Sequence, residues 1–350
     1  MLSVLGRDEF CRQRQIMDGE DMTVKARMLK LLEQNENELI SGEVAAAELN
    51  CTRAAIWKAV KSLREEGYTI EAGPNKGYVL RGGSRLSEEG IRLYLNHPDA
   101  SVKIYRELDS TNRAAKEAAF SGEAGHGALI LARQQKNGRG RRGRSFYSPE
   151  NAGLYMSIVL RPERTLKEGL LITTAAATAV YRAVKKICGI DLGIKWVNDL
   201  YLHDKKVCGI LTEAVTDFES GNIEFAVVGI GLNLYTPEDG FPEDIQGTAG
   251  ALFGGRKEAE HINCSLLVAE IVNQLLMEAE TPELSREYTE NNIIPGNMIV
   301  ITDGTRTREA YAKTIAPDGR LLVREQDGSE TLLSYGEVSV RRKPEEDQLN

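Results

Sequence analysis

Apolar residues recur at helical spacing near the start of the chain. Between residues 24 and 32 they fall at i, i+4, i+7 and i+8, which places them on one face of a helix. A second helix is predicted over 41–49 and a third over 52–67, with Ser41 and Thr52 as their N-caps. The third helix carries apolar residues at positions that face inward. Three short helices are therefore expected in the first part of the chain.

Two strand-like runs follow the third helix. Residues 68–70 and 78–80 are rich in aromatic and β-branched side chains, and the turn-forming residues 73–77 join them. Three helices followed by such a hairpin are typical of a winged helix-turn-helix domain. Winged helices bind DNA or dock on other proteins, and both functions remain open at this point.

Strands and helices are mixed in the central part of the chain, which predicts an α+β domain. The predicted strands and long helices occupy residues 128–132, 154–160, 166–188, 194–197, 225–234 and 264–279. From residue 296 the pattern alternates between apolar and polar positions. Three Asp-Gly turns interrupt it, at 303–304, 318–319 and 327–328, and predict a small β-barrel. The predicted domains are an extension 1–21 without regular structure, a winged helix-turn-helix domain 22–81, a central domain 85–292 and a barrel 295–342.

Composition narrows the class of protein. The 350 residues are 41% hydrophobic and 27% charged, which is ordinary for globular domains, and the net charge of −8 argues against a protein that coats nucleic acid. The five cysteines are an odd number without CxxC spacing, so neither a disulfide framework nor a zinc site is indicated. We predict a protein of the reducing cytoplasm that has no membrane-spanning helix.

The stretch 138–145, GRGRRGRS, holds four arginines and three glycines. Glycines leave backbone N–H groups accessible and arginines donate in pairs to phosphate or carboxylate, so this segment is predicted to bind an anion. A solvated basic loop or an RNA-binding patch is an alternative. A P-loop is excluded because Arg144 stands where lysine is required and no helix follows.

Further motifs follow the arginine-rich stretch: Lys195-Trp196-Val197-Asn198-Asp199, then 205–213 and 229–233. Each alone is compatible with a charged hairpin. Together with the arginine-rich stretch they resemble the biotin protein ligases, of the class that also represses transcription through an N-terminal DNA-binding domain. Val197 stands where that family has proline, and Phe146 where it commonly has a tryptophan that stacks on adenine.

The resemblance implies an activity: biotin and ATP form biotinyl-5′-AMP, which then acylates a lysine of a biotin carboxyl carrier domain, such as that of acetyl-CoA carboxylase. Mg²⁺ would arrive with ATP, without a metal site on the protein. Lys206 is expected to bridge the two reacting anions, Arg141 to hold phosphate, and Asp199 to direct the proton of the acceptor amine.

The resemblance also implies contacts. Those with biotin are Ser110, Thr111, Gln135, Gly138, Arg139, Arg141, Lys206 and Gly209. Those with ATP or the adenylate are Arg139, Arg141, Arg142, Arg144, Phe146, Lys195, Asn198 and Asn233. Ser110 is also predicted to be the N-cap of the following helix, and it can both cap that helix and contact biotin.

The third helix is predicted to contact operator DNA. Residues 50–64 include four cations and no acid, although the chain as a whole is acidic. The expected DNA contacts are Thr52, Arg53, Trp57, Lys58 and Lys61. By resemblance, biotinyl-AMP would act as corepressor for a homodimer, and strand 225–234 is our candidate for an edge that pairs across the dimer. A lipoate ligase and a biotin-sensing transcription factor without catalysis are the alternative functions.

Overall fold

The structure is a computed structural model. It describes residues 23–35, 37–65, 68–73, 77–81, 86–162, 169–217, 219, 222–280, 283–303, 306–334 and 338–342. The predicted extension 1–21, most of the wing turn and the linker residues 82–84 lie outside these ranges. The chain divides into two compact units, Met1–Tyr94 with His261–Leu266 and Leu95–Glu260 with Leu267–Asn350. Each unit is described separately.

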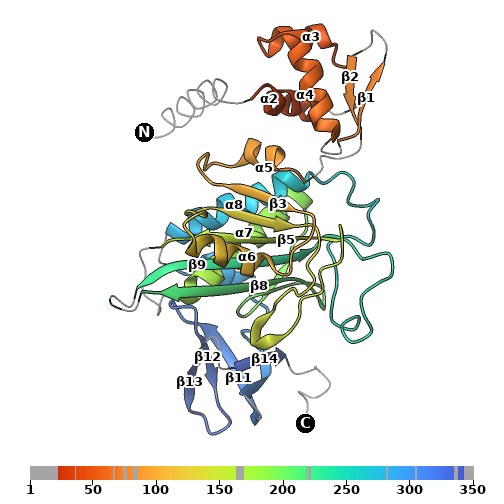
Figure 1. Cartoon of the computed structure of the whole chain (residues 1–350). Coiled ribbons are helices and arrows are strands. Elements are labelled where there is room, and N and C mark those ends of the chain that lie inside the picture. The colour runs from red at the N-terminus through yellow and green to blue at the C-terminus, as the bar shows by residue number, and fades with distance from the viewer. Residues whose placement is uncertain are drawn as a thin grey trace, which may run out of the picture. The chain divides into compact units, whose positions relative to one another are not determined.

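The first unit contains the predicted winged helix-turn-helix (Figure 1). Its elements are α2 (Val24–Gln34), α3 (Gly42–Glu48), α4 (Arg53–Glu65), β1 (Ile70–Gly73), β2 (Gly77–Leu80) and α5 (Glu88–Tyr94). The side chains of Ser41 and Thr52 accept hydrogen bonds from backbone amides three residues on, as expected of N-caps. The core includes Met28, Leu32, Ile56 and Leu63, all fully buried, so the helical spacing predicted the buried faces.

The first strand of the wing begins later than predicted. The amide of Tyr68 donates to the carbonyl of Leu63 at 3.0 Å and so closes the end of α4. Pairing starts only at Ile70, which lies opposite Leu80 in the antiparallel ladder. Tyr68 is buried, and it was placed in the strand because aromatic residues are common in strands.

The second unit is built on a sheet of seven strands (Figure 1). In spatial order they are β3 (Val102–Tyr105), β4 (Leu129–Ala132), β5 (Gly153–Leu160), β9 (Ile223–Asn233), β8 (Lys205–Thr216), β7 (Asp199–Leu202) and β6 (Gly193–Lys195). The pair β3–β4 is parallel and the other pairs are antiparallel. The expectation that strand 225–234 is an edge is wrong, because β9 pairs with β5 on one side and β8 on the other.

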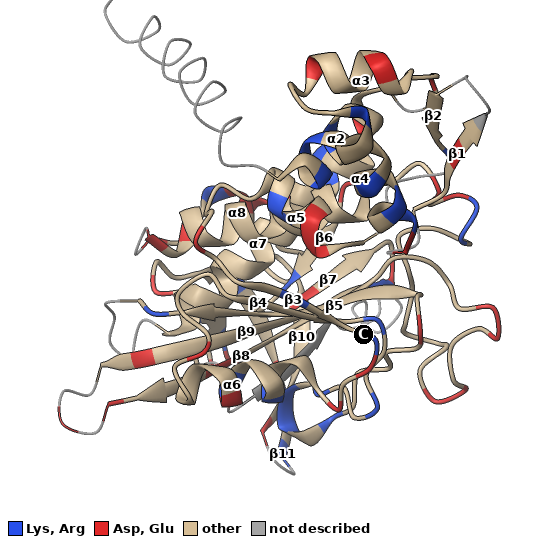
Figure 2. Ribbon diagram, turned by 45° about the horizontal axis from the view of Figure 1, so that its top comes forward, with Lys and Arg blue, Asp and Glu red and all other residues tan. Residues whose placement is uncertain are grey.

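Helices cover both faces of this sheet. Helix α6 (Thr111–Phe120) lies on one side, and α7 (Gly169–Cys188) and α8 (Cys264–Glu280) lie on the other (Figures 1 and 2). Phe225 and Val227 pack against the alanines of α6, whereas Thr212 faces the opposite way and accepts a hydrogen bond from Thr173 of α7 at 2.8 Å. Alternation along the strands therefore separates the two faces. The short helix α9 (Arg286–Glu290) follows α8 in the chain.

The chain continues into a five-stranded antiparallel sheet of the SH3-like type. Its strands are β10 (Met298–Asp303), β11 (Arg306–Ile315), β12 (Leu321–Arg324), β13 (Glu330–Leu333) and β14 (Val338–Arg342). Alternate residues such as Ile299, Ile301, Leu321 and Val323 are fully buried. The second and third predicted Asp-Gly turns join β11 to β12 and β12 to β13, and residue 304 of the first lies outside the described residues.

Among the residues that the structure describes, no helix is long and apolar enough to cross a bilayer.

Candidate functional site

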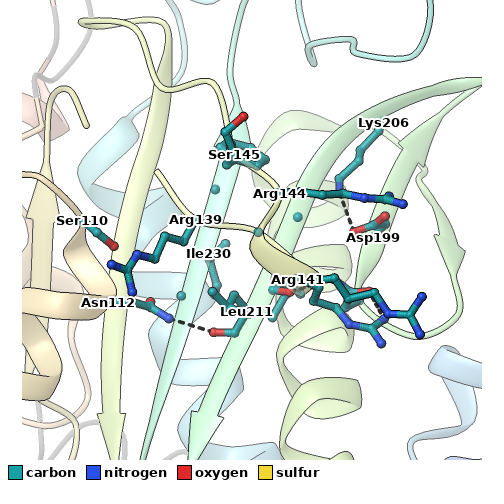
Figure 3. Close-up of a pocket in the computed structure, with 18 of the residues that line it drawn as sticks. Ser110, Asn112, Arg139, Arg141, Arg144, Ser145, Asp199, Lys206, Leu211 and Ile230 are labelled. Atoms are coloured by element: carbon teal, nitrogen blue, oxygen red, sulfur yellow. Dashed lines mark hydrogen bonds and ion pairs between the residues drawn. The ribbon is translucent and has the colours of Figure 1, made fainter. Parts of the chain in front are cut away.

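A cavity of about 510 Å³ opens on the face of the sheet that carries α6 (Figure 3). Thirteen of the predicted site residues line it, namely Ser110, Thr111, Gln135, Arg139, Arg141, Arg142, Arg144, Phe146, Lys195, Asn198, Asp199, Lys206 and Gly209. They come from segments up to a hundred residues apart. The fold thus brings together the motifs that the sequence showed separately.

The arginine-rich stretch forms a short hairpin over this cavity. The amide of Phe146 donates to the carbonyl of Gly138 at 2.8 Å, and that of Gly140 to the carbonyl of Arg144 at 2.7 Å. The chain reverses at Gly143, whose φ of +71° lies in the left-handed region that favours glycine. Figure 3 shows Arg139 and Arg141 leaving the hairpin in different directions. The hairpin therefore places cations at more than one point along the cavity.

Arg141 is held by the segment after β6. Its Nη1 donates to Asn198 Oδ1 at 3.1 Å, and Asn198 Nδ2 in turn donates to the carbonyl of Ile210 at 2.8 Å. Asn198 is buried and bonded on both sides, so its side chain has a fixed orientation. This chain of bonds links the arginine hairpin to β8.

Glycines form the floor of the cavity. Gly209 of β8 and Gly231 of β9 lie opposite each other in the ladder. A Cβ on Gly231 would lie 2.5 Å from Phe146 Cε1, and one on Gly209 would lie 3.2 Å from Phe146 Cε2 and 3.1 Å from Lys206 Nζ. The Phe146 ring therefore lies directly on the backbone of both strands, which only glycine permits.

Lys206 and Asp199 form an ion pair beside the glycine floor. Lys206 Nζ lies 2.6 Å from Asp199 Oδ1, and both side chains are partly exposed to the cavity (Figure 3). The backbone of Lys206 is fixed as well, since its amide donates to Thr248 O at 2.8 Å and its carbonyl accepts from Gly250 N at 2.9 Å. A cation and a carboxylate are thus presented together by β7 and β8.

A polar network fixes the end of the cavity at α6. Thr111 donates to Gln135 Oε1 through its amide at 2.9 Å and its hydroxyl at 3.2 Å, and Gln135 Nε2 donates to Ser148 Oγ at 2.9 Å. The amide of Gln135 is therefore oriented with its carbonyl toward α6. Ser110 occupies the N-cap position of α6 but its side chain makes no capping hydrogen bond, and the buried hydroxyl lines the cavity.

Asn112 is a site residue that sequence reasoning missed. It is buried, accepts from Ser157 Oγ at 2.7 Å and donates to Glu213 Oε2 at 2.9 Å and to Leu211 O at 3.2 Å. Its position directly after Ser110 and Thr111 was the available signal. Trp196, Tyr201 and Thr248 also line the cavity without having been predicted. Thr248 lies in a long irregular loop, where no periodic pattern marks it.

Glu213 and Lys116 join α6 to β8 by an ion pair of 2.7 Å. Burial alone would raise the pKa of the Glu213 carboxyl, but the hydrogen bonds and charge of Lys116, with the hydrogen bond from Asn112, lower it below its ordinary value of 4.5. The charged form is therefore the one that the fold stabilises.

This shift gives a pH dependence. A lowered pKa means that the stabilisation is fully present above the ordinary glutamate pKa and is lost as the pH falls through the lowered value. We expect Glu213→Gln to reduce the free energy of unfolding by about 1–2 kcal/mol at neutral pH. Thermal unfolding of both proteins from neutral pH to about pH 3 checks this. The difference in melting temperature should narrow with falling pH, and a constant difference would contradict the assignment.

Two of the residues predicted for biotin or ATP, Gly138 and Asn233, do not line the cavity. A Cβ on Gly138 would lie 2.3 Å from the carbonyl oxygen of Phe146, so this glycine permits the close approach of the two ends of the hairpin. The side chain of Asn233 is buried and donates to the carbonyl of Gly250 at 2.8 Å. Asn233 thus holds the loop that contains Thr248.

The cations predicted to contact DNA lie on α4 of the first unit (Figure 2). Arg53, Trp57, Lys58 and Lys61 are exposed, with Trp57 57% accessible and Lys61 Nζ 5.7 Å from the centre of its ring. Arg64 differs from the other cations, because its guanidinium donates to Ile70 O at 2.8 and 2.6 Å and so joins α4 to the wing. The exposed face of α4 is basic and carries one large aromatic side chain.

Among the described residues, no group of three or more His, Cys, Asp or Glu side chains is placed to hold a metal ion.

Comparisons with known proteins agree with the fold. Residues 104–233 match the biotin/lipoate A/B protein ligase family, and residues 25–79 match an HTH domain. The biotin protein ligase from Aquifex aeolicus in complex with biotin and ATP has a similar fold, with a TM-score of 0.57 and 24% identity over 69% of this chain and 99% of that one. The class is therefore that of biotin/lipoate protein ligases with an N-terminal HTH domain.

Two curated relatives narrow the class further. The bifunctional ligase/repressor BirA of Bacillus spizizenii is 32% identical over 89% of this chain and 97% of its own length. BirA of Escherichia coli is 31% identical over 92% of this chain and 98% of its own length. The chain belongs to the BirA family of bifunctional ligase/repressors.

Proposed function

We propose that the protein ligates biotin to a lysine of biotin carboxyl carrier domains and represses transcription when loaded with biotinyl-5′-AMP. The observation that carries the ligase function is the convergence of the arginine hairpin and Lys206 over the glycine floor. Such a cavity suits a reaction between two anions, which needs charge neutralisation and alignment and no enzyme nucleophile. The BirA relatives support biotin over lipoate and catalysis over a purely regulatory function.

In the first step a carboxylate oxygen of biotin attacks the α-phosphorus of ATP, and pyrophosphate leaves. Lys206 bridges the carboxylate and an α-phosphate oxygen, and Arg139 and Arg141 neutralise the phosphates. The contacts of Lys206 with Asp199 and of Arg141 with Asn198 support these roles, since they place both cations at the cavity. Mg²⁺ bound to the triphosphate would offset part of its negative charge.

Biotin occupies the end of the cavity at α6, where its ureido ring meets Ser110, Thr111 and Gln135. The adenylate lies toward Lys195 and Asn198, with Phe146 against the adenine. The fixed amide of Gln135 and the buried hydroxyl of Ser110 support the first assignment. The position of Phe146 on the glycine floor supports the second.

In the second step the neutral amine of the acceptor lysine attacks the carbonyl carbon of the mixed anhydride. An amide forms and AMP leaves with the bonding electrons. Asp199 takes the proton that the amine loses, directly or through Lys206, to which it is paired at 2.6 Å. Biotin-dependent exchange of pyrophosphate into ATP tests the first step without an acceptor. Absence of that exchange would refute the ligase function.

The glycine floor gives a prediction for the nucleotide side. In Gly231→Ala the new Cβ would lie 2.5 Å from the Phe146 ring, so the ring must shift. We expect the KM for ATP to rise about tenfold, since overpacking typically costs about 1–3 kcal/mol. Gly125→Ala is the control, because no heavy atom lies within 4 Å of its Cβ. Equal KM values in the two variants would show that Phe146 does not contribute to nucleotide binding.

Repression is proposed from the HTH domain and its basic α4. One helix with few exposed cations contacts only a half-site, so two copies are needed for a full operator. We expect biotin plus ATP to tighten both dimerisation and operator binding, because the linkage between them is reciprocal. Sedimentation and operator titration with and without the two substrates check this. If operator affinity is the same in both conditions, the repressor function is contradicted and only the ligase function remains.

A further inference from the structure

We propose that the turn between β11 and β12 of the C-terminal sheet positions the nucleotide side of the cavity, with Gly319 and Trp196 as the positioning residues. This inference rests on the proposed function, because it concerns the binding of ATP. It assigns the C-terminal sheet a part in the first step, through one hydrogen bond.

The contact is direct and buried. Trp196 is 5% exposed, and its indole Nε1 donates to the carbonyl oxygen of Gly319 at 2.9 Å. This bond satisfies the N–H of a buried ring, so a displaced turn would either move the indole or leave its donor unpaired. Trp196 itself lines the cavity, as do Lys195 and Asn198 of the same segment.

Hydrogen bonds and an ion pair fix the conformation of the turn between β11 and β12. Its ends are closed by hydrogen bonds between Ala316 N and Arg320 O and between Gly319 N and Ala316 O, both 2.8 Å. An ion pair of 2.6 Å between Asp318 and Arg320 braces it. Gly319 has a φ of +83°, and a Cβ there would lie 3.1 Å from Leu170 of α7. A side chain at Gly319 would therefore fit only if Leu170 of α7 moved by a few tenths of an ångström.

The segment after β6 is held at three consecutive residues. Trp196 is held by the C-terminal sheet, the carbonyl of Val197 accepts from Tyr288 of α9 at 3.0 Å, and Asn198 is bonded to Ile210 of β8. Asn198 then holds Arg141 of the arginine hairpin. We therefore expect a shift of the indole to displace Asn198 and Arg141, which we assign to the nucleotide. The biotin end at α6 is anchored by a separate network and should not respond.

The chain offers a matched control for this turn. Gly328, between β12 and β13, has a φ of +85° and the same closing bonds, between Glu325 N and Ser329 O at 2.8 Å and between Gly328 N and Glu325 O at 3.1 Å. A Cβ on Gly328 meets no heavy atom within 4 Å. Alanine thus introduces the same backbone strain at both glycines, but only at Gly319 does it act on α7 and Trp196.

The test compares Gly319→Ala, Gly328→Ala and Trp196→Phe in steady-state pyrophosphate release with biotin, ATP and a carrier domain as acceptor. Hydrogen exchange of residues 194–199 is followed in the same full-length proteins. We expect Gly319→Ala and Trp196→Phe to raise the KM for ATP about tenfold and to speed exchange, with the KM for biotin unchanged. Gly328→Ala should match the wild type in all three.

The outcomes are distinct. A loss of folded protein would lower kcat and leave both KM values unchanged, which would contradict a positioning role. Faster exchange in Gly319→Ala with an unchanged KM for ATP would also overturn the inference, since the turn would then only support the fold. No pyrophosphate release from the wild type would refute the proposed function itself.

Discussion

Replacing Lys206 by alanine is expected to slow adenylate formation by about 10²–10³-fold, the usual effect of removing a group that stabilises charge in the transition state. Its ammonium lies beside the glycine floor and is the cation that β8 presents to the cavity together with Asp199. Both reacting groups are anions, so losing this charge affects the transition state more than the separate substrates. The rate of biotin-dependent pyrophosphate release measures the effect.

Lys103→Ala is the control for general effects of losing a lysine. Lys103 lies on the edge strand β3, is half exposed, pairs with Glu123 at 3.7 Å and does not line the cavity. Surface pairs of this kind contribute little to stability, so this variant should behave as wild type. Pyrophosphate release by Lys206→Ala at the rate of Lys103→Ala would remove Lys206 from the mechanism.

Replacing Arg141 by glycine is expected to speed the escape of biotinyl-AMP by about 10–100-fold, the loss of one charge-assisted contact to phosphate. The change also removes the hydrogen bond to Asn198, which joins the hairpin to β8. A released mixed anhydride acylates amines without selection. Retention of labelled biotinyl-AMP after rapid gel filtration measures the escape, and biotin on bystander proteins reports its consequence.

Arg106→Gly is the matched control for Arg141→Gly. Its side chain is 87% exposed and lies 3.7 Å from Glu150, and it does not line the cavity. Retention of the adenylate by Arg141→Gly equal to that of Arg106→Gly would show that Arg141 is dispensable for holding the intermediate.

Local chemistry explains what the sequence predicted well. The caps Ser41 and Thr52 act on amides three residues away, and the helical spacing of the core residues around Ile56 depends only on neighbouring turns. The arginine-rich stretch was recognisable by itself, whereas the motifs at 195–199, 205–213 and 229–233 indicated a ligand site only in combination with it. The caps, the helical spacing and the arginine-rich stretch require no knowledge of distant parts of the chain.

Long-range pairing explains what the sequence did not predict. A continuous apolar run suits either an edge or a central strand, and only the partners of β9 on both sides place it centrally. Thr248 reaches the cavity because its irregular loop pairs with Lys206, which no periodic pattern marks. The contact of Trp196 with Gly319 joins residues 123 positions apart. Such contacts follow from packing of whole elements.

The most direct test of the ligase function offers the protein a choice of acid. The full-length chain is incubated with ATP, Mg²⁺ and a carrier domain, together with either labelled biotin or labelled lipoate, and the label on the carrier lysine is measured. We predict that biotin is transferred, that transfer requires ATP, and that Lys206→Ala slows it by about 10²–10³-fold. Transfer of lipoate in preference to biotin, or no transfer of either acid to a competent carrier domain, would contradict the account.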